Sequence, residues 1–339
     1  MLPAITDIAL HSLKKAVVDL GLKPYAATQL VQWLYSKRAK SFDDVTDVSK
    51  EGRKLLKERY EISAVEIVGE QKASDGTLKL LCKAHDGKCV ECVLIPALDG
   101  RTTACLSTQV GCAMKCAFCR TASMGFVRNL TLGEITGQLI LLARASSTPI
   151  TNVVFMGMGE PLANMEAVEN AIAVFRNEKA FGLSKRRITV STCGLIPELK
   201  KFCERNDVKA AISLNATTDD VRTKLMPINK QWPIAKIMNF SREYSKRSRY
   251  RVTFEYVMIK GMNDSEDDAK RLIKLLHGVR AKVNLIPFNS YESSKFKAPL
   301  ENTLDWWSDF LREKGIQVNI RASRGQEILA ACGQLAAKC

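Results

Sequence analysis

The stretch TTACLSTQVGCAMKCAFC, residues 102–119, combines a short apolar strand with three cysteines. Its first residues have the β-branched and apolar composition that is typical of a strand. Cys112, Cys116 and Cys119 follow with Cys-x3-Cys-x2-Cys spacing. Three thiolates on one loop can hold three irons of a cubane cluster and leave the fourth iron without a protein ligand. We therefore interpret this loop as a [4Fe–4S] site with one open iron.

Zinc is the alternative metal for such a loop. A structural zinc site is completed by a fourth cysteine or histidine, whereas His11, His85 and His277 are distant in the sequence. The chain has eleven cysteines and no evident secretion signal, and this odd count argues against a disulfide framework. Metal ligation and thiol chemistry are thus the favoured interpretations for at least some of the cysteines.

From residue 102 onward, strand-like and helix-like segments alternate. Strand-like runs occupy residues 102–108, 150–157, 187–192, 208–214, 252–259 and 282–288, with a last one at 316–322. Helical stretches between them include residues 131–146, 163–177, 233–246, 264–277 and 301–313. The tetrapeptide TLGE at 131–134 has the form of a capping box. Six strand–helix repeats predict a parallel, barrel-type sheet with its functional edge at the C-terminal ends of the strands.

The residues before 98 follow two other patterns. Apolar residues recur at helical spacing in residues 1–60, whereas residues 62–97 contain three short strand-like runs separated by Asp-Gly turns. We therefore predict an α/β fold with a partial (βα)6 barrel at 98–339. A small helical domain at 1–61 and a short antiparallel β extension at 62–97 precede it.

The net charge of +15 is unevenly distributed. Residues 1–100 carry +1 and residues 101–339 carry +14. Such an excess favours nucleic acid over a membrane surface as partner, although a solvated basic surface is the plain alternative. No apolar run approaches the ~20 residues of a membrane span, and the N-terminus does not resemble a signal peptide. We expect a cytoplasmic protein with no membrane partner.

Residues suited to binding a ligand follow several of the predicted strands. FMGMGEP at 155–161 contains Gly157 and Gly159, which let the backbone approach a ligand, and Glu160, which can accept a hydrogen bond from an amino group. Ser191, the segment 213–215 and Asn289 also lie at strand ends. Turn chemistry explains each of them singly, but their common edge favours a shared ligand.

Several motifs occur in order along the chain: CLSTQVGCAMKCAFCRTASMGFVRNL, GMGEPLAN, GLSKRRITVST, SLNATTD, LMPINK, NLIPFN and AACGQL. On these motifs the chain resembles the RlmN/Cfr family of radical SAM RNA methyltransferases over nearly its whole length. The resemblance implies a [4Fe–4S] cluster and two S-adenosylmethionine molecules per turnover. It also implies 23S rRNA and tRNA as substrates and a reducing partner such as flavodoxin or ferredoxin.

The resemblance assigns a role to individual residues. Cys112, Cys116 and Cys119 match the cluster ligands. The positions that match S-adenosylmethionine contacts are Gly159, Glu160, Ser191, Ser213, Leu214, Asn215 and Asn289. Many family members have histidine where this chain has Asn215, which puts a side-chain contact at that position in doubt.

Three further residues match the family's chemistry. Cys332 matches the cysteine that becomes S-methylated, Cys105 the resolving cysteine, and Glu91 the proton acceptor. In the family mechanism the methyl carbon on Cys332 is activated as a radical and adds to the base. Cys105 then releases the product by forming a disulfide with Cys332. Because a disulfide needs Cα atoms within roughly 7 Å, these two distant cysteines must meet in space.

Three basic clusters are candidates for RNA contact: KRAK at 37–40, SKRR at 184–187 and REYSKRSRYR at 242–251. Tyr244 and Tyr250 lie within the last cluster, a combination suited to phosphate contact and base stacking. An RlmN-type enzyme acting on adenine carbon 2 is the leading hypothesis. The alternatives are a Cfr-type carbon-8 enzyme and a non-catalytic iron–sulfur protein that binds RNA or senses redox state.

Overall fold

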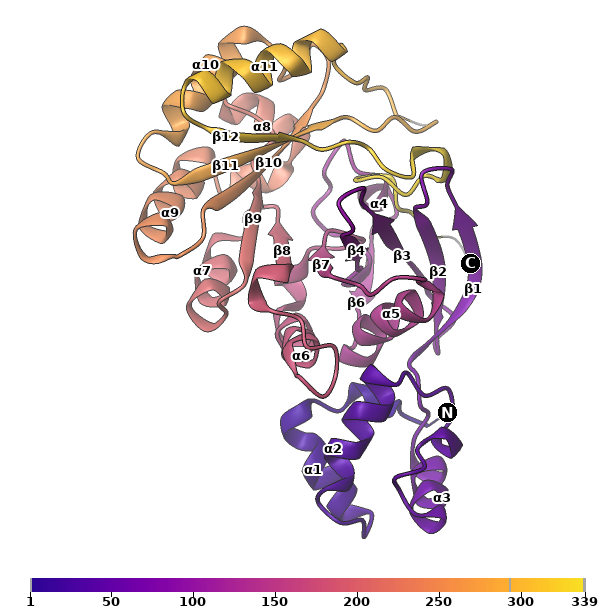
Figure 1. The fold of residues 1–339 in the computed structure, drawn as a ribbon. Helices are drawn as coiled ribbons and strands as arrows, with labels where there is room; N and C mark the ends of the chain where they lie inside the picture. The colour runs from indigo at the N-terminus through magenta and orange to yellow at the C-terminus, as the bar shows by residue number, and fades with distance from the viewer. Residues whose placement is uncertain (1, 293, 338–339) are drawn as a thin grey trace.

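The computed structural model describes residues 2–292 and 294–337 (Figure 1). A small helical unit lies at one end of the molecule and an α/β body at the other. The helical unit contains α1 (Leu10–Asp19), α2 (Ala26–Val31) and α3 (Lys50–Arg59). Their buried side chains include Leu13, Val17, Leu30 and Leu56, so these helices pack through the apolar stripe that predicted them. The helical character of residues 1–60 is confirmed.

One ten-stranded sheet crosses the described part of the α/β body, in the order β1-β2-β3-β4-β7-β8-β9-β10-β11-β12. Its strands are β1 (Val65–Lys72), β2 (Leu78–Ala84), β3 (Cys89–Pro96), β4 (Thr102–Cys105), β7 (Asn152–Phe155), β8 (Ile188–Thr192), β9 (Lys209–Ser213), β10 (Val252–Met258), β11 (Ala281–Pro287) and β12 (Gln317–Ile320). The strands from β4 to β12 pair in parallel, whereas β1 to β4 pair antiparallel. The predicted barrel-type sheet and antiparallel patch are both confirmed.

The antiparallel strands continue directly into the barrel sheet. Val93 of β3 pairs with Cys105 of β4, and Cys105 pairs on its other side with Val154 of β7. Residue 97 lies in the turn between the antiparallel strands β3 and β4, and the change from antiparallel to parallel pairing comes after β4. As a consequence, β3 and β4 lie side by side at the start of the barrel.

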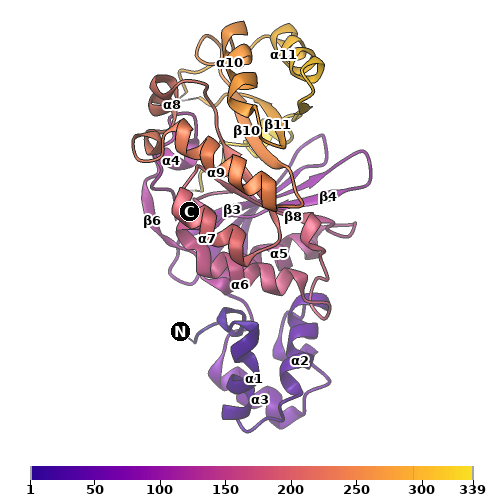
Figure 2. The ribbon, with the colours of Figure 1, turned by 90° about the vertical axis from the view of Figure 1, so that its left-hand side faces the viewer.

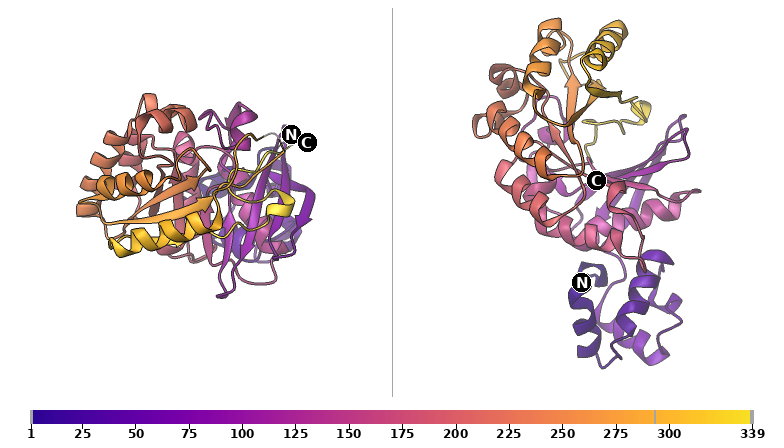
Figure 3. Two further views of the ribbon diagram at one scale, coloured as in Figure 1. Left: turned by 90° about the horizontal axis from the view of Figure 1, so that it is seen from above. Right: turned by 60° about the vertical axis from the view of Figure 1, so that its left-hand side comes forward.

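Helices cover the outer face of the parallel strands (Figures 2 and 3). They are α5 (Leu132–Ala145), α6 (Met165–Arg176), α7 (Ile196–Arg205), α8 (Asp219–Leu225), α9 (Ile234–Arg247), α10 (Glu266–Leu276) and α11 (Glu301–Glu313). The Thr131–Glu134 capping box opens α5 as predicted, while α7 and α8 add to the helices predicted from periodicity. None of the described helices is long and apolar enough to cross a membrane.

The alternation of side chains along β10 separates the helix layer from the barrel interior. Tyr256 packs against Trp307 of α11, with ring centroids 5.3 Å apart. Successive side chains of a strand point to opposite faces, so Glu255 points to the interior. There the Glu255 carboxylate accepts a hydrogen bond from Asn284 of β11 at 2.8 Å. The barrel thus has an apolar outer layer and a polar interior.

Candidate active site

A two-stranded hairpin supports the cysteine loop. β5 (Gln109–Gly111) and β6 (Phe126–Asn129) pair antiparallel, and the three cysteines and α4 (Arg120–Ser123) lie between them. The backbone N–H of Cys112 donates to the carbonyl of Gly125 at 2.8 Å. Within the loop, the Ala117 N–H donates to the carbonyl of Leu225, the last residue of α8, at 2.9 Å. The loop is therefore held from both the hairpin and α8.

Replacement of Gly111 tests whether the hairpin holds the cysteine loop in place. Its φ is +73°, and an added Cβ would lie 1.8 Å from the Gly125 carbonyl oxygen. We expect Gly111→Ala to destabilise the protein by about 3 kcal/mol and to lower its iron content after reconstitution, because the loop backbone must shift. Iron and sulfide analysis and urea unfolding measure these effects.

Gly125→Ala is the matched control, because Gly125 also has a positive φ, +71°, but has open space around its Cβ position. Only the backbone strain of about 1–2 kcal/mol is expected there, with normal iron content. Equal losses of iron in the two variants would contradict the steric explanation.

The sulfur-bearing side chains of Cys112, Cys116 and Cys119 line one cavity of about 160 Å³. All three are free thiols. Burial raises the pKa of Cys112 to about 12 and also raises that of Cys116. The thiolates of Cys112 and Cys116 therefore form in this cavity only when a strongly cationic centre compensates them. None of the three histidines lines the cavity among the residues that the structure describes. A fourth cysteine, Cys193, also lines it, but Cys193 lies against the Glu160 carboxylate rather than on the loop. Three cysteines on one loop fit an iron–sulfur cluster with one open iron.

The loop after β7 forms another wall of the cavity. An added Cβ on Gly157 would lie 2.7 Å from the Leu106 carbonyl oxygen. Gly159 has φ +99°, and its added Cβ would lie 2.5 Å from the Gln109 side chain. Both glycines are thus required by close packing against the chain itself. This packing brings the loop against the strand that leads into the cysteines.

Glu160 ends this loop as a buried carboxylate in the cavity wall. Its Oε2 accepts from the Cys193 N–H at 2.7 Å and its Oε1 from the Leu162 N–H at 3.1 Å. The Glu160 N–H donates to Gln109 Oε1 at 2.8 Å. Burial raises the pKa of Glu160 above its ordinary value in spite of these hydrogen bonds. A cationic ligand in this cavity would therefore stabilise the ionised form of Glu160.

A pH dependence of ligand binding follows from Glu160. Binding of an ammonium group needs the ionised carboxylate, and the folded-state pKa lies above the ordinary ~4.3. We expect the affinity for S-adenosylmethionine to fall about tenfold per pH unit below that raised pKa. Calorimetric titration of the reconstituted protein measures it. Glu160→Gln should bind weakly with no such pH dependence, and unchanged binding in this variant would exclude the contact.

The ends of β8 and β9 complete this side of the cavity. Ser191, Cys193, Ser213 and Asn215 all line it. Asn215 has φ +56°, and its side chain is engaged within the protein: Oδ1 accepts from the Val257 N–H at 2.7 Å and Nδ2 donates to Met226 Sδ at 3.2 Å. The Asn215 side chain thus fixes the turn after β9.

The C-terminal segment, residues 322–337, closes the cavity beside the cysteine loop. The Arg120 N–H donates to the Gly333 carbonyl at 2.7 Å, and Thr121 Oγ1 donates to the Leu335 carbonyl at 2.7 Å. Cys332 lies in this segment and lines the 160 Å³ cavity. Cys332 is exposed, and desolvation by the surrounding protein raises the pKa of its thiol.

Cys332 also lines a second cavity, of about 340 Å³, whose wall includes Cys105. The structure therefore brings together two cysteines that are 227 residues apart in the sequence. Burial raises the pKa of the Cys105 thiol to about 12. Arg321 lines the same cavity, and its positive charge favours the thiolate forms of both cysteines.

Comparison with known proteins decides the family. Residues 106–273 match the radical SAM superfamily, and residues 4–62 match the ribosomal RNA large subunit methyltransferase N-terminal domain. Dual-specificity RNA methyltransferase RlmN of Syntrophotalea carbinolica is 43% identical over 334 residues, which cover 98% of this chain and 90% of that protein. The protein of the same name from Geotalea uraniireducens is 44% identical, with coverages of 98% and 96%.

The chain belongs to the RlmN family of radical SAM RNA methyltransferases. A crystal structure of a radical SAM methyltransferase from Sphaerobacter thermophilus has the same fold, with a TM-score of 0.95 and 40% identity, covering 99% of this chain and 100% of that one. The predicted cofactors, a [4Fe–4S] cluster and S-adenosylmethionine, are those of this superfamily.

We call the 160 Å³ cavity that Cys112, Cys116 and Cys119 line the cluster cavity. Two residues that match S-adenosylmethionine contacts in the RlmN family lie outside it. Leu214 is fully buried, its N–H donates to the Glu255 carbonyl, and its carbonyl accepts from Arg222. Asn289 lines the second cavity, where its Nδ2 donates to the Cys332 carbonyl at 3.1 Å. Its Oδ1 accepts from Gln326 Nε2 at 2.9 Å. In this structure Asn289 therefore positions the C-terminal segment.

Glu91, the match to the proton acceptor of the RlmN family, lies under the C-terminal segment. Its Oε1 is 3.0 Å from Lys79 Nζ, and its Oε2 accepts from the Ala336 N–H at 2.8 Å. Both Lys79 and Glu91 are buried. The carboxylate lines neither of the two cavities in the described part of the chain. In this structure the C-terminal segment therefore covers Glu91.

Sequence reasoning missed Arg222 and Glu255. Arg222 is fully buried and donates to the carbonyls of Cys193, Ser213 and Leu214, which ties the ends of β8 and β9 to α8. Glu255 lines the cluster cavity, and its buried Oε2 has no hydrogen-bond partner among the described residues. A charged residue in the middle of the apolar run VTFEYVMI was the one sequence signal for Glu255. Arg222, within a charged helix, carried none.

Proposed function

We propose that this RlmN-family chain methylates carbon 2 of an adenosine in the peptidyl-transferase region of 23S rRNA. We extend the proposal to the adenosine 3′ to the anticodon in some tRNAs. The main observation in support is the position of Cys332, which borders both the cavity of the three cluster cysteines and the cavity that contains Cys105. A methyl carbon on Cys332 would face the radical source on one side and the resolving thiol on the other.

In the proposed methyl transfer, individual residues have separate roles. The Cys332 thiolate takes a methyl group from the sulfonium of one S-adenosylmethionine. When bound, the cluster and a second S-adenosylmethionine supply the one-electron chemistry that activates this methyl group. Cys112, Cys116 and Cys119 would hold the cluster, with Gly159, Glu160, Ser191, Ser213 and Asn215 around S-adenosylmethionine. The activated carbon on Cys332 bonds to the base, and the unpaired electron that this addition leaves on the adduct would return to the oxidised cluster.

Glu91 and Cys105 complete the reaction. Glu91 takes the proton from the base carbon after the C-terminal segment has released its Oε2 from the Ala336 N–H. The Cys105 thiolate then attacks Cys332 Sγ, the sulfur–carbon bond breaks, and the carbon takes a proton to become the methyl group. The Cys105–Cys332 disulfide that results needs two electrons, which we assign to a cellular dithiol reductant. A flavodoxin or ferredoxin would supply the low-potential electron for the cluster.

Anaerobic reconstitution followed by methylation of rRNA fragments and tRNA tests this function. Mass spectrometry of the digested RNA should show 2-methyladenosine. An 8-methyladenosine product would instead support the Cfr-type alternative. If cluster-loaded protein bound RNA but transferred no methyl group with any of these substrates, the non-catalytic alternative would stand.

A further inference from the structure

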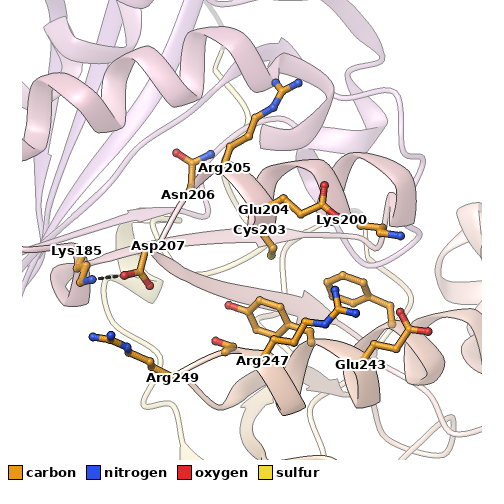
Figure 4. Close-up of a pocket in the computed structure, with 13 residues that line it drawn as sticks. Lys185, Lys200, Cys203, Glu204, Arg205, Asn206, Asp207, Glu243, Arg247 and Arg249 are labelled. Carbon is orange, nitrogen blue, oxygen red and sulfur yellow. Dashed lines mark hydrogen bonds and ion pairs between the residues drawn. The ribbon is translucent and has the colours of Figure 1, made fainter.

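A cavity of about 470 Å³ lies on the outer side of the barrel between α7 and α9 (Figure 4). We call it the α7–α9 cavity. Its lining includes Lys185, just before β8, Asp207, just before β9, and Arg249, just before β10. These positions are at the N-terminal ends of the strands, whereas the cluster cavity lies at their C-terminal ends. The α7–α9 cavity is therefore not part of the active site.

Two basic clusters that are far apart in the sequence meet at this cavity. The 184–187 cluster contributes Lys185, and the 242–251 cluster contributes Arg247 and Arg249. Figure 4 shows Cys203 and Asp207 on one side of the cavity and Arg247 and Arg249 on the other. Lys200 of α7 adds another cation. The fold has thus concentrated positive charge that the sequence distributes over more than sixty residues.

Much of this charge has no counter-ion within the protein. Lys185 pairs with Asp207, and Arg205 pairs with Glu169. Lys200, Arg247 and Arg249 make no ion pair with any residue in the part of the chain that the structure describes. The lining also contains Glu204 and Glu243, so the three cations without an ion pair stand beside two carboxylates. The balance is positive.

Positive charge also crowds the neighbouring strand ends. Burial lowers the pKa of Lys209, the first residue of β9, and the nearby cations Lys282 and Arg187 lower it further. Burial likewise lowers the pKa of Lys282 on β11. Like charges held close together repel one another, and a polyanion that binds across them relieves this repulsion.

We propose that the α7–α9 cavity binds backbone phosphates of the RNA substrate, in an arm remote from the reacting adenosine. The proposal rests on RNA being the substrate. The guanidinium groups of Arg247 and Arg249 suit phosphate oxygens, to which arginine binds bidentately. Tyr244, stacked on Phe240 with ring centroids 5.7 Å apart, gives the cavity an apolar wall for a ribose or base. The volume suits a single nucleotide.

The length of the barrel makes this contact separable from catalysis. β10 has seven residues, which at about 3.3 Å per residue span roughly 23 Å between its two ends. The α7–α9 cavity also lies on the outer face of the barrel, so an RNA whose loop is in the active site must extend around the barrel to reach it. We expect an isolated anticodon stem-loop to be too short for this path. A full-length tRNA or a large rRNA fragment extends far enough to occupy both.

The test uses surface variants of the full chain. Arg247→Gln/Arg249→Gln removes the two charges, and Arg247→Glu/Arg249→Glu reverses them. Lys274→Glu/Lys314→Glu, on exposed positions of α10 and just after α11, is the control with the same charge change as the second variant. A glutamate at the C-terminal end of α9 can destabilise that helix, whereas a glutamine is neutral. The glutamine variant therefore separates the loss of charge from an effect on folding. RNA binding and steady-state methylation are measured with full-length tRNA and with its isolated anticodon stem-loop.

We expect both cavity variants to raise KM for full-length tRNA about tenfold, with kcat and the stem-loop reaction unchanged. The slope of log affinity against log salt should fall by about 1.5, since each lost phosphate contact removes ~0.7–0.9. An unchanged KM and salt slope would overturn the proposal. So would an equal loss on both RNAs, or an effect confined to the rate of reduction by flavodoxin, which would indicate an acidic protein partner. Because binding is measured apart from turnover, failure of the proposed function would be recognised separately.

Discussion

Replacement of Cys332 by alanine is expected to abolish methylation of RNA completely. Cys332 is the described thiol that borders both the cluster cavity and the Cys105 cavity, so no other described cysteine can carry carbon between them. Cleavage of S-adenosylmethionine by the reduced protein should continue, because the three ligands of the cluster are untouched. Mass spectrometry of RNA and of S-adenosylmethionine products measures the two activities side by side.

Cys105→Ala should fail at a later stage. The carbon would still pass from Cys332 to the base, but no thiol would attack Cys332 Sγ, so a covalent protein–RNA adduct should accumulate. A gel shift that resists denaturation and is lost on RNase treatment detects the adduct. Cys203→Ala is the control, because Cys203 lies in the α7–α9 cavity far from the chemistry. Multiple turnover by Cys105→Ala would exclude the resolving role, and methylation by Cys332→Ala would exclude the carbon-carrier role.

Loss of Arg222 should have the largest effect on stability. Its guanidinium makes hydrogen bonds with the carbonyls of Cys193, Ser213, Leu214 and Trp232 and with Asn229 Oδ1, at distances of 2.8–3.1 Å. Arg222→Met would fill the space but leave these buried acceptors unpaired, at about 1–3 kcal/mol each. We expect at least about 4 kcal/mol of destabilisation, or failure to fold. Urea unfolding of the purified protein measures it.

Arg222→Lys should recover only part of this stability, because an ammonium group cannot span acceptors on β8, β9 and α8 at once. Burial lowers the pKa of Arg222 to about 10, and the same burial would disfavour the charged form of a lysine at this position. Arg271→Met is the control, since Arg271 is partly exposed and bonds Thr217 and Asp268. A change of about 1 kcal/mol or less is expected there. Equal effects at the two positions would contradict the buried-network explanation.

Short-range patterns determined much of this fold before any tertiary structure was known. Period and turn chemistry are local properties, so the helices of residues 1–60, the antiparallel patch and the parallel strands could all be predicted. The spacing of Cys112, Cys116 and Cys119 is likewise local, because one loop of eight residues presents all three thiols. The boundary near residue 97 was harder to interpret. Residue 97 lies in the turn between β3 and β4, which pair antiparallel within one sheet, and this pairing is a tertiary property.

These short-range patterns could not predict contacts between residues that are far apart in the sequence. The cluster hypothesis needed only the eight residues 112–119, whereas the meeting of Cys105 and Cys332 depends on where the C-terminal segment packs. The same packing places the Ala336 N–H on Glu91 and the Cys332 carbonyl on Asn289. Other tertiary contacts make Arg222 a shared donor for the ends of β8 and β9 and bring the cations of the α7–α9 cavity together. The amino-acid sequence by itself determined the cysteine loop and the succession of strands and helices along the chain, because these follow from near neighbours. The tertiary structure decided which distant thiols, carboxylates and cations face one another, because burial and packing join residues that no sequence spacing relates.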